Sequence, residues 1–357
     1  MKLITIVGAR PQFVKAAAVS REIAKHPEIT EIIVHTGQHF DKNMSAIFFK
    51  EMEIPKPKYN LNINGLSHGA MTGQMLEGIE KIILDEKPDF VVVYGDTNST
   101  IAGALATKKL HAKVVHIEAG LRSFNMKMPE EINRILTDRI SDILFCPTDE
   151  AIKNLNKEGF ENYDCEIIKS GDVMQDAAMF YAEKSKEKST IIKKLKLKKF
   201  ILCTLHRAEN TDDLNNLKSI INALNKINTE TPMVFPLHPR TKKIIQKNKI
   251  EMKFRSIEPV GYFDMLELLK HCSLVMTDSG GLQKEAFFFK KNCVTLREQT
   301  EWVELVENNF NMLAGSNAEK IYSSYKKMIS VKSNFKINLY GNGTACKKIV
   351  GSLSKHK

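Results

Sequence analysis

Three acidic residues in the first half of the chain have types and positions that suit proton transfer. Asp96 lies in YGDTNST and Glu118 in HIEAGLR, each directly after an apolar run, and Glu130 lies in MPEEINR, a proline-led helix start. A carboxylate beside a buried strand costs solvation free energy unless it is paired or used. Several carboxylates at one site can move protons, although Asp96 could equally cap a helix.

Basic residues accompany these carboxylates. Arg10 lies in GARPQ, after the first apolar run, where it could meet an anion at the N-terminus of the next helix. This loop has one glycine and lacks the GxGxxG spacing, so we expect no nicotinamide or flavin there. Arg134 and Asp138 follow Glu130 at four-residue intervals and would share its helix face, a pattern that a surface ladder of charges also produces.

The second half of the chain offers groups that suit an anionic nucleotide. His206 in LHRAEN and His238 in PLHPR both follow apolar runs, and two such histidines are less easily explained as structural than one. In TDSGGLQKE, the Ser279–Gly281 turn precedes a predicted helix, whose N-terminal amides favour a phosphate. Glu285, one turn into that helix, could bind a ribose. A purely structural turn remains the alternative.

Strands that end beside these residues are needed to position them. The first half alternates strand-sized, β-branched apolar runs with amphipathic segments such as Ala70–Glu86 and Ser99–Leu110. Near-continuous apolar strands separated by helices indicate an α/β fold with a parallel sheet covered on both faces. The predicted strands are Lys2–Val7, Glu31–His35, Phe90–Tyr94, Lys113–Glu118 and Ile143–Cys146.

The same alternation restarts beyond residue 172, after a lysine-rich stretch. The strands predicted there are Phe200–Thr204, Pro232–Phe235, Arg255–Ile257, Leu274–Met276 and Asn292–Leu296. Two consecutive sheets of this kind predict two doubly wound domains, whose ligands bind at the carboxyl ends of the strands. We therefore expect domains at 1–171 and 172–335, with the site in the cleft between them.

Composition excludes several classes of protein. The chain has 357 residues, 43% of them hydrophobic and 27% charged, which is typical of globular domains. The formal net charge of +11 suggests an anionic partner, but the lysine clusters read best as solvated helix faces. We find no nucleic-acid-binding motif and no apolar run long enough to span a bilayer. We therefore expect neither a nucleic acid nor a membrane as partner.

Other motifs and the cysteines narrow the chemistry further. The six cysteines include no CxxC pair, which favours reduced, mostly buried thiols in a cytoplasmic protein and argues against a zinc site. The DxD, GxxxxGK[ST] and HExxH patterns do not occur. Metal-bridged sugar transfer, P-loop hydrolysis and zinc proteolysis therefore lack their usual signatures, and we expect no metal.

These segments together resemble one family. The motifs GARPQFVK, YGDTNST, HIEAGLR, MPEEINR, LHRAEN, TDSGGLQKEA and LREQTEWVE occur in the order found in the non-hydrolysing UDP-N-acetylglucosamine 2-epimerases, and LYGNGTACKKI extends the match to the end of the chain. The resemblance implies the GT-B (glycogen-phosphorylase-like) fold, two Rossmann-like domains with UDP held mainly by the second. It also implies a last helix, at 336–357, that crosses back to the first domain, a homodimer, and no metal or redox cofactor.

The resemblance also implies a reaction. The proton on sugar C2 is removed as UDP leaves, a glycal stays bound, and UDP adds back after reprotonation on the other face. Because this proton is weakly acidic, stabilisation of the leaving pyrophosphate must lower much of the barrier. The resemblance assigns proton transfer to Asp96, Glu118 and Glu130 in no stated order, and places His206 near the leaving phosphate. The other residues that it places at the site are Arg10, Lys15, Arg134, Ser279, Gly280, Gly281 and Glu285.

Three segments depart from the family pattern of enzymes that act on plain UDP-GlcNAc. QHFD at 38–41 replaces QHRE or QHRQ, the loop at 64–68 differs, and TEWVE at 300–304 replaces TERPE. The first two belong to the family's regulatory UDP-GlcNAc site. This variant resembles the branch that acts on UDP-2,3-diacetamido-2,3-dideoxyglucuronate, so we expect that substrate or a UDP-GlcNAc-type sugar, in polysaccharide precursor synthesis.

Three alternatives remain open from the sequence. A GT-B glycosyltransferase shares the fold and the nucleotide site but has no need of three carboxylates. A hydrolysing epimerase would release free sugar and UDP, and a nucleotide-sugar-binding regulator would turn over no UDP-sugar.

Overall fold

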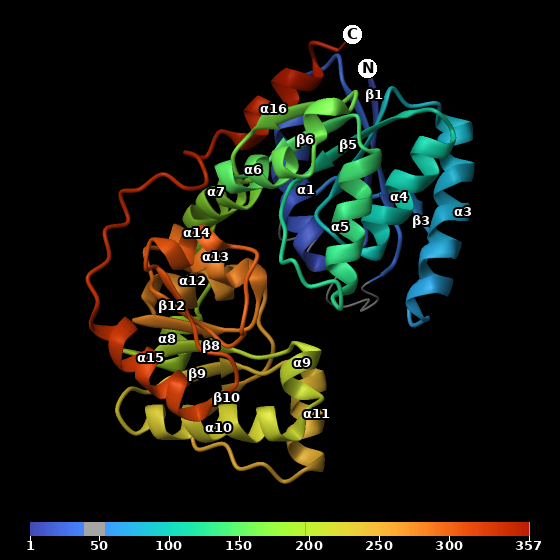
Figure 1. The fold of residues 1–357 in the computed structure, drawn as a ribbon. Coiled ribbons are helices and arrows are strands. Elements are labelled where there is room, and N and C mark those ends of the chain that lie inside the picture. Colours follow the sequence, from blue (N-terminus) through green and yellow to red (C-terminus); the bar gives the residue numbers. More distant parts are fainter. Residues whose placement is uncertain (39–53, 197, 357) are drawn as a thin grey trace. The chain divides into compact units, whose positions relative to one another are not determined.

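The computed structural model describes residues 1–38, 54–196 and 198–356. The chain forms two compact units (Figure 1). Unit 1 contains Met1–Ala177 together with Asn338–Lys357, and unit 2 contains Ala178–Ile337. Helix α7 (Val173–Lys188) carries the chain from the first unit to the second, which is why the division falls a few residues beyond the Ser170-Gly171-Asp172 turn.

Unit 1 is built on a seven-stranded parallel sheet in the order β3-β2-β1-β4-β5-β6-β7. The strand order reverses between β1 and β4, which defines a doubly wound sheet and its ligand-binding edge. The strands are β1 (Lys2–Val7), β2 (Thr30–His35), β3 (Tyr59–Asn60), β4 (Phe90–Tyr94), β5 (Lys113–Ile117), β6 (Ile143–Cys146) and β7 (Glu166–Lys169).

Helices cover both faces of this sheet. Helices α3, α4 and α5 lie side by side in one layer, and α16 packs against α1 (Figure 1). The chain termini lie close together at one end of unit 1 (Figure 1). The helical elements are α1 (Arg10–Ile23), α3 (His68–Glu86), α4 (Asn98–Lys109), α5 (Pro129–Ile140), α6 (Asp149–Lys157), the 3-10 turn η1 (Phe160–Asn162) and α16 (Ala345–Leu353).

Unit 2 repeats the design with a six-stranded parallel sheet in the order β10-β9-β8-β11-β12-β13. Its strands are β8 (Ile201–Thr204), β9 (Met233–Pro236), β10 (Arg255–Ile257), β11 (Leu274–Thr277), β12 (Cys293–Thr295) and β13 (Asn311–Leu313). Its helices are α8 (Ile191–Leu195), α9 (Ala208–Thr211), α10 (Leu214–Asn228), α11 (Pro239–Lys247), α12 (Tyr262–His271), α13 (Gly280–Phe288), α14 (Val303–Glu307) and α15 (Ala318–Ser330).

The prediction of two doubly wound α/β sheets is confirmed, and all ten predicted strands are present within a residue or two. Strands β3, β7 and β13 were not predicted from the sequence. Each has only two to four residues, and the edge strand β7 is partly exposed. Too few apolar positions stand in such strands to show a pattern.

The central strands form the core because their side chains are buried on both faces. In unit 1, Ile4, Ile6 and Val91 pack toward α3 and α4, and in unit 2 Ile201 and Phe235 pack toward α10 and α15. All six cysteines are free thiols, and five are buried while Cys165 is half-buried. The expectation of mostly buried, unbridged cysteines is therefore confirmed.

The end of the chain belongs to unit 1. The Asp172 amide donates to the Tyr340 carbonyl at 2.8 Å, and the Cys346 amide donates to the Asp176 carboxylate at 2.8 Å. Ile349 and Val350 of α16 are fully buried. Within the described residues, no helix is long and apolar enough to cross a membrane.

Candidate functional site

Two predicted carboxylates lie in neighbouring turns at the carboxyl edge of the first sheet. Asp96 follows β4 and Glu118 follows β5, and these strands pair directly. The Glu118 carboxylate accepts a hydrogen bond from the Lys15 ammonium at 2.6 Å, with both side chains more than 90% buried. Because Lys15 comes from α1, the pair joins the first helix to the end of β5. Burial makes this ion pair far less screened than a surface pair.

The backbone around this pair is held in an unusual conformation. Glu118 has a φ of +75°, in the left-handed region that residues with a side chain rarely adopt. Its amide and that of Ala119 both donate to the Phe145 carbonyl at 3.1 Å. Strain of this kind clusters at functional sites. Gly95 also has a positive φ, and a side chain there would approach Lys15 Nζ to 3.3 Å.

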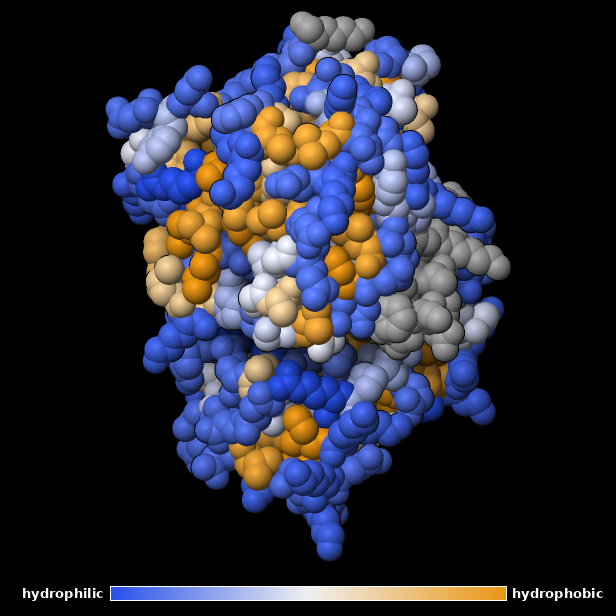
Figure 2. All heavy atoms as spheres, turned by 90° about the vertical axis from the view of Figure 1, so that its right-hand side faces the viewer, coloured by the Kyte–Doolittle hydropathy of each residue, from blue (hydrophilic) through white to orange (hydrophobic). Residues whose placement is uncertain are grey.

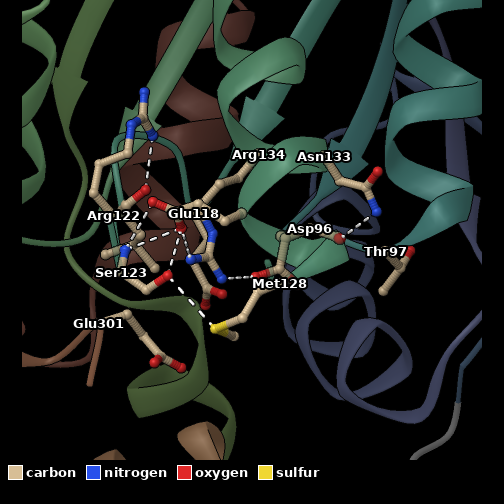
Figure 3. Close-up of polar contacts among 12 residues, drawn as sticks. Asp96, Thr97, Glu118, Arg122, Ser123, Met128, Asn133, Arg134 and Glu301 are labelled. Carbon is tan, nitrogen blue, oxygen red and sulfur yellow. Dashed lines mark hydrogen bonds and ion pairs between the residues drawn. The ribbon is translucent and has the colours of Figure 1, made fainter. Parts of the chain in front are cut away.

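Arg134 of α5 binds two carboxylates at once. One guanidinium nitrogen bonds to Asp96 (Figure 3). Another bonds to Glu131. Asn133, the preceding residue, donates to the Asp96 carbonyl at 3.0 Å. Arg134 is buried, so its alternative interpretation as part of a surface ladder is wrong. Helix α5 instead orients the Asp96 turn.

Glu131 organises the loop before α5. Its fully buried carboxylate accepts hydrogen bonds from the amides of Ser123 and Phe124 and from the Ser123 hydroxyl, at 2.8–3.0 Å. Glu131 was not among the predicted site residues, although it stands beside Glu130 in MPEEINR. An acidic residue on the buried side of an amphipathic helix was the available signal, since such a group must be paired.

The other predicted residues of unit 1 lie at helix N-termini. Arg10 is the first residue of α1, and Glu130 is in the first turn of α5, and both are partly exposed. The turn before α1 is held by Gln12, whose side-chain oxygen accepts from the amides of Gly8 and Ala9. This contact gives the loop its shape without the second and third glycines of a dinucleotide-binding loop.

In unit 2, His206 is held by a buried carboxylate. Asp278 accepts from the amides of His206 and Arg207, and its Oδ1 lies 3.5 Å from His206 Nδ1. The His206 side chain is 39% exposed, whereas Asp278 is fully buried. An imidazole supported in this way can face a ligand with its other nitrogen. Asp278 was not among the predicted site residues, although it lies in TDSGGLQKE.

The glycine turn opens helix α13. Ser279 is its N-cap and accepts from the Leu282 amide. A side chain at Gly280 would come within 2.2 Å of the Glu301 carboxylate, whereas one at Gly281 would meet nothing within 4 Å. Gly280 therefore serves packing, and Gly281 leaves the helix N-terminus open to an approaching group. Glu285 is buried and accepts from the Tyr262 hydroxyl at 3.0 Å.

His238 and the Thr300–Glu304 segment, which departs from the family pattern, are the remaining parts of the second unit to be placed. His238 is the N-cap of α11, and its ring lies 6.0 Å from that of His206. Trp302 is buried, with Lys284 Nζ 3.9 Å from its ring centroid. Arg297, which the sequence analysis missed, is buried and bonds to Glu301 at 3.0 Å.

The segments that the resemblance assigns to a regulatory site are partly described. Gln38 accepts from the amide and hydroxyl of Ser99 at 3.1 and 2.8 Å. The divergent loop ends at His68, the first residue of α3, whose ring contacts Asn98. The rest of the QHFD segment, 39–41, lies outside the described residues. In the part of the chain that is described, no three histidine, cysteine or acidic residues are grouped as a metal site would require.

The fold and these two sets of residues define a class of protein, the enzymes that bind nucleotide-linked substrates at the carboxyl edges of parallel sheets. The chain belongs to the UDP-N-acetylglucosamine 2-epimerase family, whose model matches residues 21–354. It is accordingly an isomerase of the non-hydrolysing type, and the family membership does not favour the alternative of a glycosyltransferase.

Individual relatives agree with this assignment. A UDP-2,3-diacetamido-2,3-dideoxy-D-glucuronate 2-epimerase of Pseudomonas aeruginosa is 55% identical, over 99% of this chain and 100% of the relative. The crystal structure of Methanocaldococcus jannaschii UDP-GlcNAc 2-epimerase in complex with UDP-GlcNAc and UDP has a TM-score of 0.93 at 43% identity, over 99% of this chain and 100% of that one. The Neisseria meningitidis enzyme bound to UDP-GlcNAc has a TM-score of 0.89 at 34% identity, over 99% and 100% of the two chains. These likenesses confirm the predicted GT-B fold.

Proposed function

We propose that the protein inverts C2 of a UDP-linked 2-acetamido sugar by eliminating and re-adding UDP. The observation that carries this proposal is the pair of cation-bound carboxylates, Asp96 with Arg134 and Glu118 with Lys15, at one sheet edge. Inversion requires proton-transferring groups on both faces of C2, because the proton leaves from one face and returns to the other. Two adjacent turns, each carrying a carboxyl group, supply candidates for the base on one face and the acid on the other.

The elimination step balances within the substrate and the protein. A carboxylate takes the C2 proton, the C2–H electrons form a double bond between C1 and C2, and the C1–O electrons leave with UDP. Addition reverses these changes after a proton returns to the other face. Asp96, Glu118 and Glu130 remain the candidates, and the cations beside Asp96 and Glu118 hold those two carboxylates in place at the sheet edge.

We assign stabilisation of the leaving UDP to unit 2. His206, held by Asp278, and the α13 N-terminus at Ser279–Gly281 supply donors for phosphate oxygens, and Glu285 supplies a carboxylate for the ribose. Arg10 and His238 are proposed as further anion-binding groups. That the carboxylates of unit 1 and the UDP-binding groups of unit 2 act on one substrate molecule stays a prediction.

For the sugar itself, we propose a 2,3-diacetamido-glucuronate, with UDP-GlcNAc as the second candidate. The 55% identity to the Pseudomonas aeruginosa relative and the Thr300–Glu304 departure support the first candidate. Incubation of the protein with each UDP-sugar in deuterated water, followed by proton NMR, tests the reaction. We expect deuterium at C2 in both epimers. Free sugar accumulating in step with UDP would indicate hydrolysis, and turnover without deuterium would contradict the proposal.

The residue roles are tested by Glu118→Gln and Asp96→Asn. Each variant keeps the shape of the side chain and removes the base, and we expect loss of C2 exchange by a factor of about 10²–10⁴. Glu285→Gln should instead weaken UDP binding, measured by calorimetry, while C2 exchange at saturating substrate is retained. Unchanged exchange in both carboxylate variants would contradict their role in proton transfer.

We further propose a cytoplasmic homodimer that acts in polysaccharide precursor synthesis. The resemblance implies the dimer, and apolar side chains are exposed on both outer helices of the α3–α5 layer, at Leu84 and at Ile132 and Leu136. Figure 2 shows apolar side chains among hydrophilic ones on the face that carries α3. Leu136→Asp should shift the sedimentation mass from dimer to monomer, whereas Val331→Asp, at an exposed apolar site of unit 2, should not. A dimer that persists in Leu136→Asp would exclude this face.

A further inference from the structure

A histidine beneath the site contacts one of the turns that carry the candidate bases, and it is linked to the other turn through Asp138. His116 is in β5 and is fully buried. Its Nε2 lies 2.8 Å from the Gly95 carbonyl oxygen, and its Nδ1 lies 2.7 Å from Asp138 Oδ1. Neither the proton transfer proposed above nor the binding of UDP uses this side chain.

The partners of His116 determine where its protons are. A carbonyl oxygen only accepts hydrogen bonds, so Nε2 must donate. Asp138 Oδ2 already accepts from Arg122 at 2.6 Å and from the Gly120 amide at 3.1 Å. Burial raises the pKa of Asp138, but the hydrogen bonds and charges of His116 and Arg122 outweigh that effect and lower it. The carboxylate is therefore ionised and accepts from Nδ1 as well.

The charges around His116 agree with this protonation. Arg122 also binds Glu158 through two hydrogen bonds, at 2.7 and 2.9 Å. With His116 charged, the cluster has two cations, His116 and Arg122, and two anions, Asp138 and Glu158. With a neutral imidazole these groups would carry one net negative charge, whose cost falls mainly on the buried Asp138, because the Glu158 side chain is 25% exposed and its carbonyl accepts from Arg139. Other titratable groups nearby are Cys146, whose thiol pKa is raised by burial, and the Lys15–Glu118 pair.

This cluster bonds to both turns, to a carbonyl group in one and to an amide group in the other. His116 holds the carbonyl of Gly95, next to Asp96, and Asp138 holds the amide of Gly120, two residues after Glu118. Gly95, Glu118 and Gly120 all have positive φ values. Turns in such conformations persist only where the surroundings hold them. The His116–Asp138 bond therefore adds a side-chain link between the two turns to the backbone bond from the Gly95 amide to the Ile117 carbonyl.

We propose that His116, protonated on both ring nitrogens and paired with Asp138, is a positioning residue that fixes the Asp96 and Glu118 turns relative to each other. Its contribution to catalysis rests on the proposed function, whereas its protonation does not. The first test is therefore independent of activity.

That test is NMR of protein labelled with ¹⁵N-histidine, with the His116 signals identified by their loss in His116→Gln. We expect both ring nitrogens of His116 to carry protons at the pH of the enzyme assay, and both N–H protons to exchange slowly with solvent. A neutral ring with one N–H proton would overturn the proposal, whether or not the protein is an epimerase.

The second test is Asp138→Asn, which keeps the size of the side chain and lets its amide donate to Nδ1. His116 should then become a neutral imidazole, and kcat for C2 exchange should fall roughly 100-fold with KM changed less than about threefold. The matched control is Glu86→Gln, another buried acid paired with basic residues but remote from both turns. It should keep the wild-type kcat and His116 spectrum. An Asp138→Asn variant with wild-type kcat and a neutral His116 would contradict the positioning role.

Discussion

At the scale of single residues, the site depends on a glycine, whose lack of a side chain leaves room for charged groups. Gly95 stands between Lys15 and Glu118, and its positive φ is one that a side chain opposes. The space beside its Cα is taken by the Lys15 ammonium and the Glu118 carboxylate, 3.3 and 3.6 Å from where a Cβ would lie. The glycine leaves room for the ion pair, because a Cβ here would press on the Lys15 ammonium.

Gly95→Ala should therefore impair catalysis more than its small volume suggests. The left-handed backbone costs an alanine about 1–2 kcal/mol, and the added methyl group would press on the Lys15 ammonium that binds Glu118. We expect C2 exchange to fall by at least about 10-fold, measured by NMR in deuterated water.

A second glycine provides the control for this substitution. Gly73 lies within α3, is exposed, and has open space where a Cβ would lie. Gly73→Ala should stabilise the protein by about 0.5–1 kcal/mol in urea unfolding without changing C2 exchange. Wild-type exchange in Gly95→Ala would show that the space beside Gly95 is not needed.

At the scale of elements, the short edge strand β3 is held by a carboxylate more than by its own hydrogen bonds. Glu86, near the C-terminus of α3, accepts from the Tyr59 hydroxyl at 2.6 Å and binds Lys58 and Lys2. The bonds from Lys58 and Tyr59 lower the pKa of Glu86 to about 2. A two-residue strand has too few ladder bonds to be stable alone, so this cluster anchors it.

The lowered pKa of Glu86 predicts how stability changes with pH. In the unfolded chain the carboxyl titrates near 4.5, so its stabilising effect is complete above that pH. The effect is lost as the pH falls from about 4.5 toward about 2, where the folded protein also takes up the proton. Glu86→Gln should therefore lower the urea midpoint at pH 7, and the difference from wild type should shrink across this range. A difference independent of pH would exclude the charge of Glu86 as the cause.

At the scale of the whole molecule, the two units are built from unequal pieces of chain. Unit 2 is one continuous segment, whereas unit 1 combines the first half of the chain with its last 20 residues. Helix α16 packs on α1, and Ile349 is fully buried there. The stability of the first unit therefore depends on residues at the far end of the sequence.

Paired core substitutions would show this dependence. Ile349→Ala should destabilise unit 1 by about 2–5 kcal/mol, visible as faster amide hydrogen exchange in α1 and β1. Ile221→Ala, at a buried position of α10 in unit 2, should accelerate exchange in β8 and β9 instead. Exchange that rises equally in both units for either variant would mean that they unfold as one.

Much of this molecule could be predicted from local pattern. Most central strands show as near-continuous apolar runs, because strands buried on both faces need mainly apolar residues. Residues that follow such runs, among them Asp96, Glu118 and His206, stand out by type alone. The resemblance then indicated the family, since several motifs occur in a fixed order along the chain.

The tertiary structure decided which charged groups meet. Lys15 and Glu118 are 103 residues apart and Arg134 and Asp96 are 38 apart, and no local pattern reports such contacts. Arg134 and Asp138 have the spacing of an exposed ladder, yet both are buried because α5 turns that face toward the sheet. Residue types and the order of the motifs are properties of the sequence. The pairing and burial of charged side chains depend on which strands lie side by side.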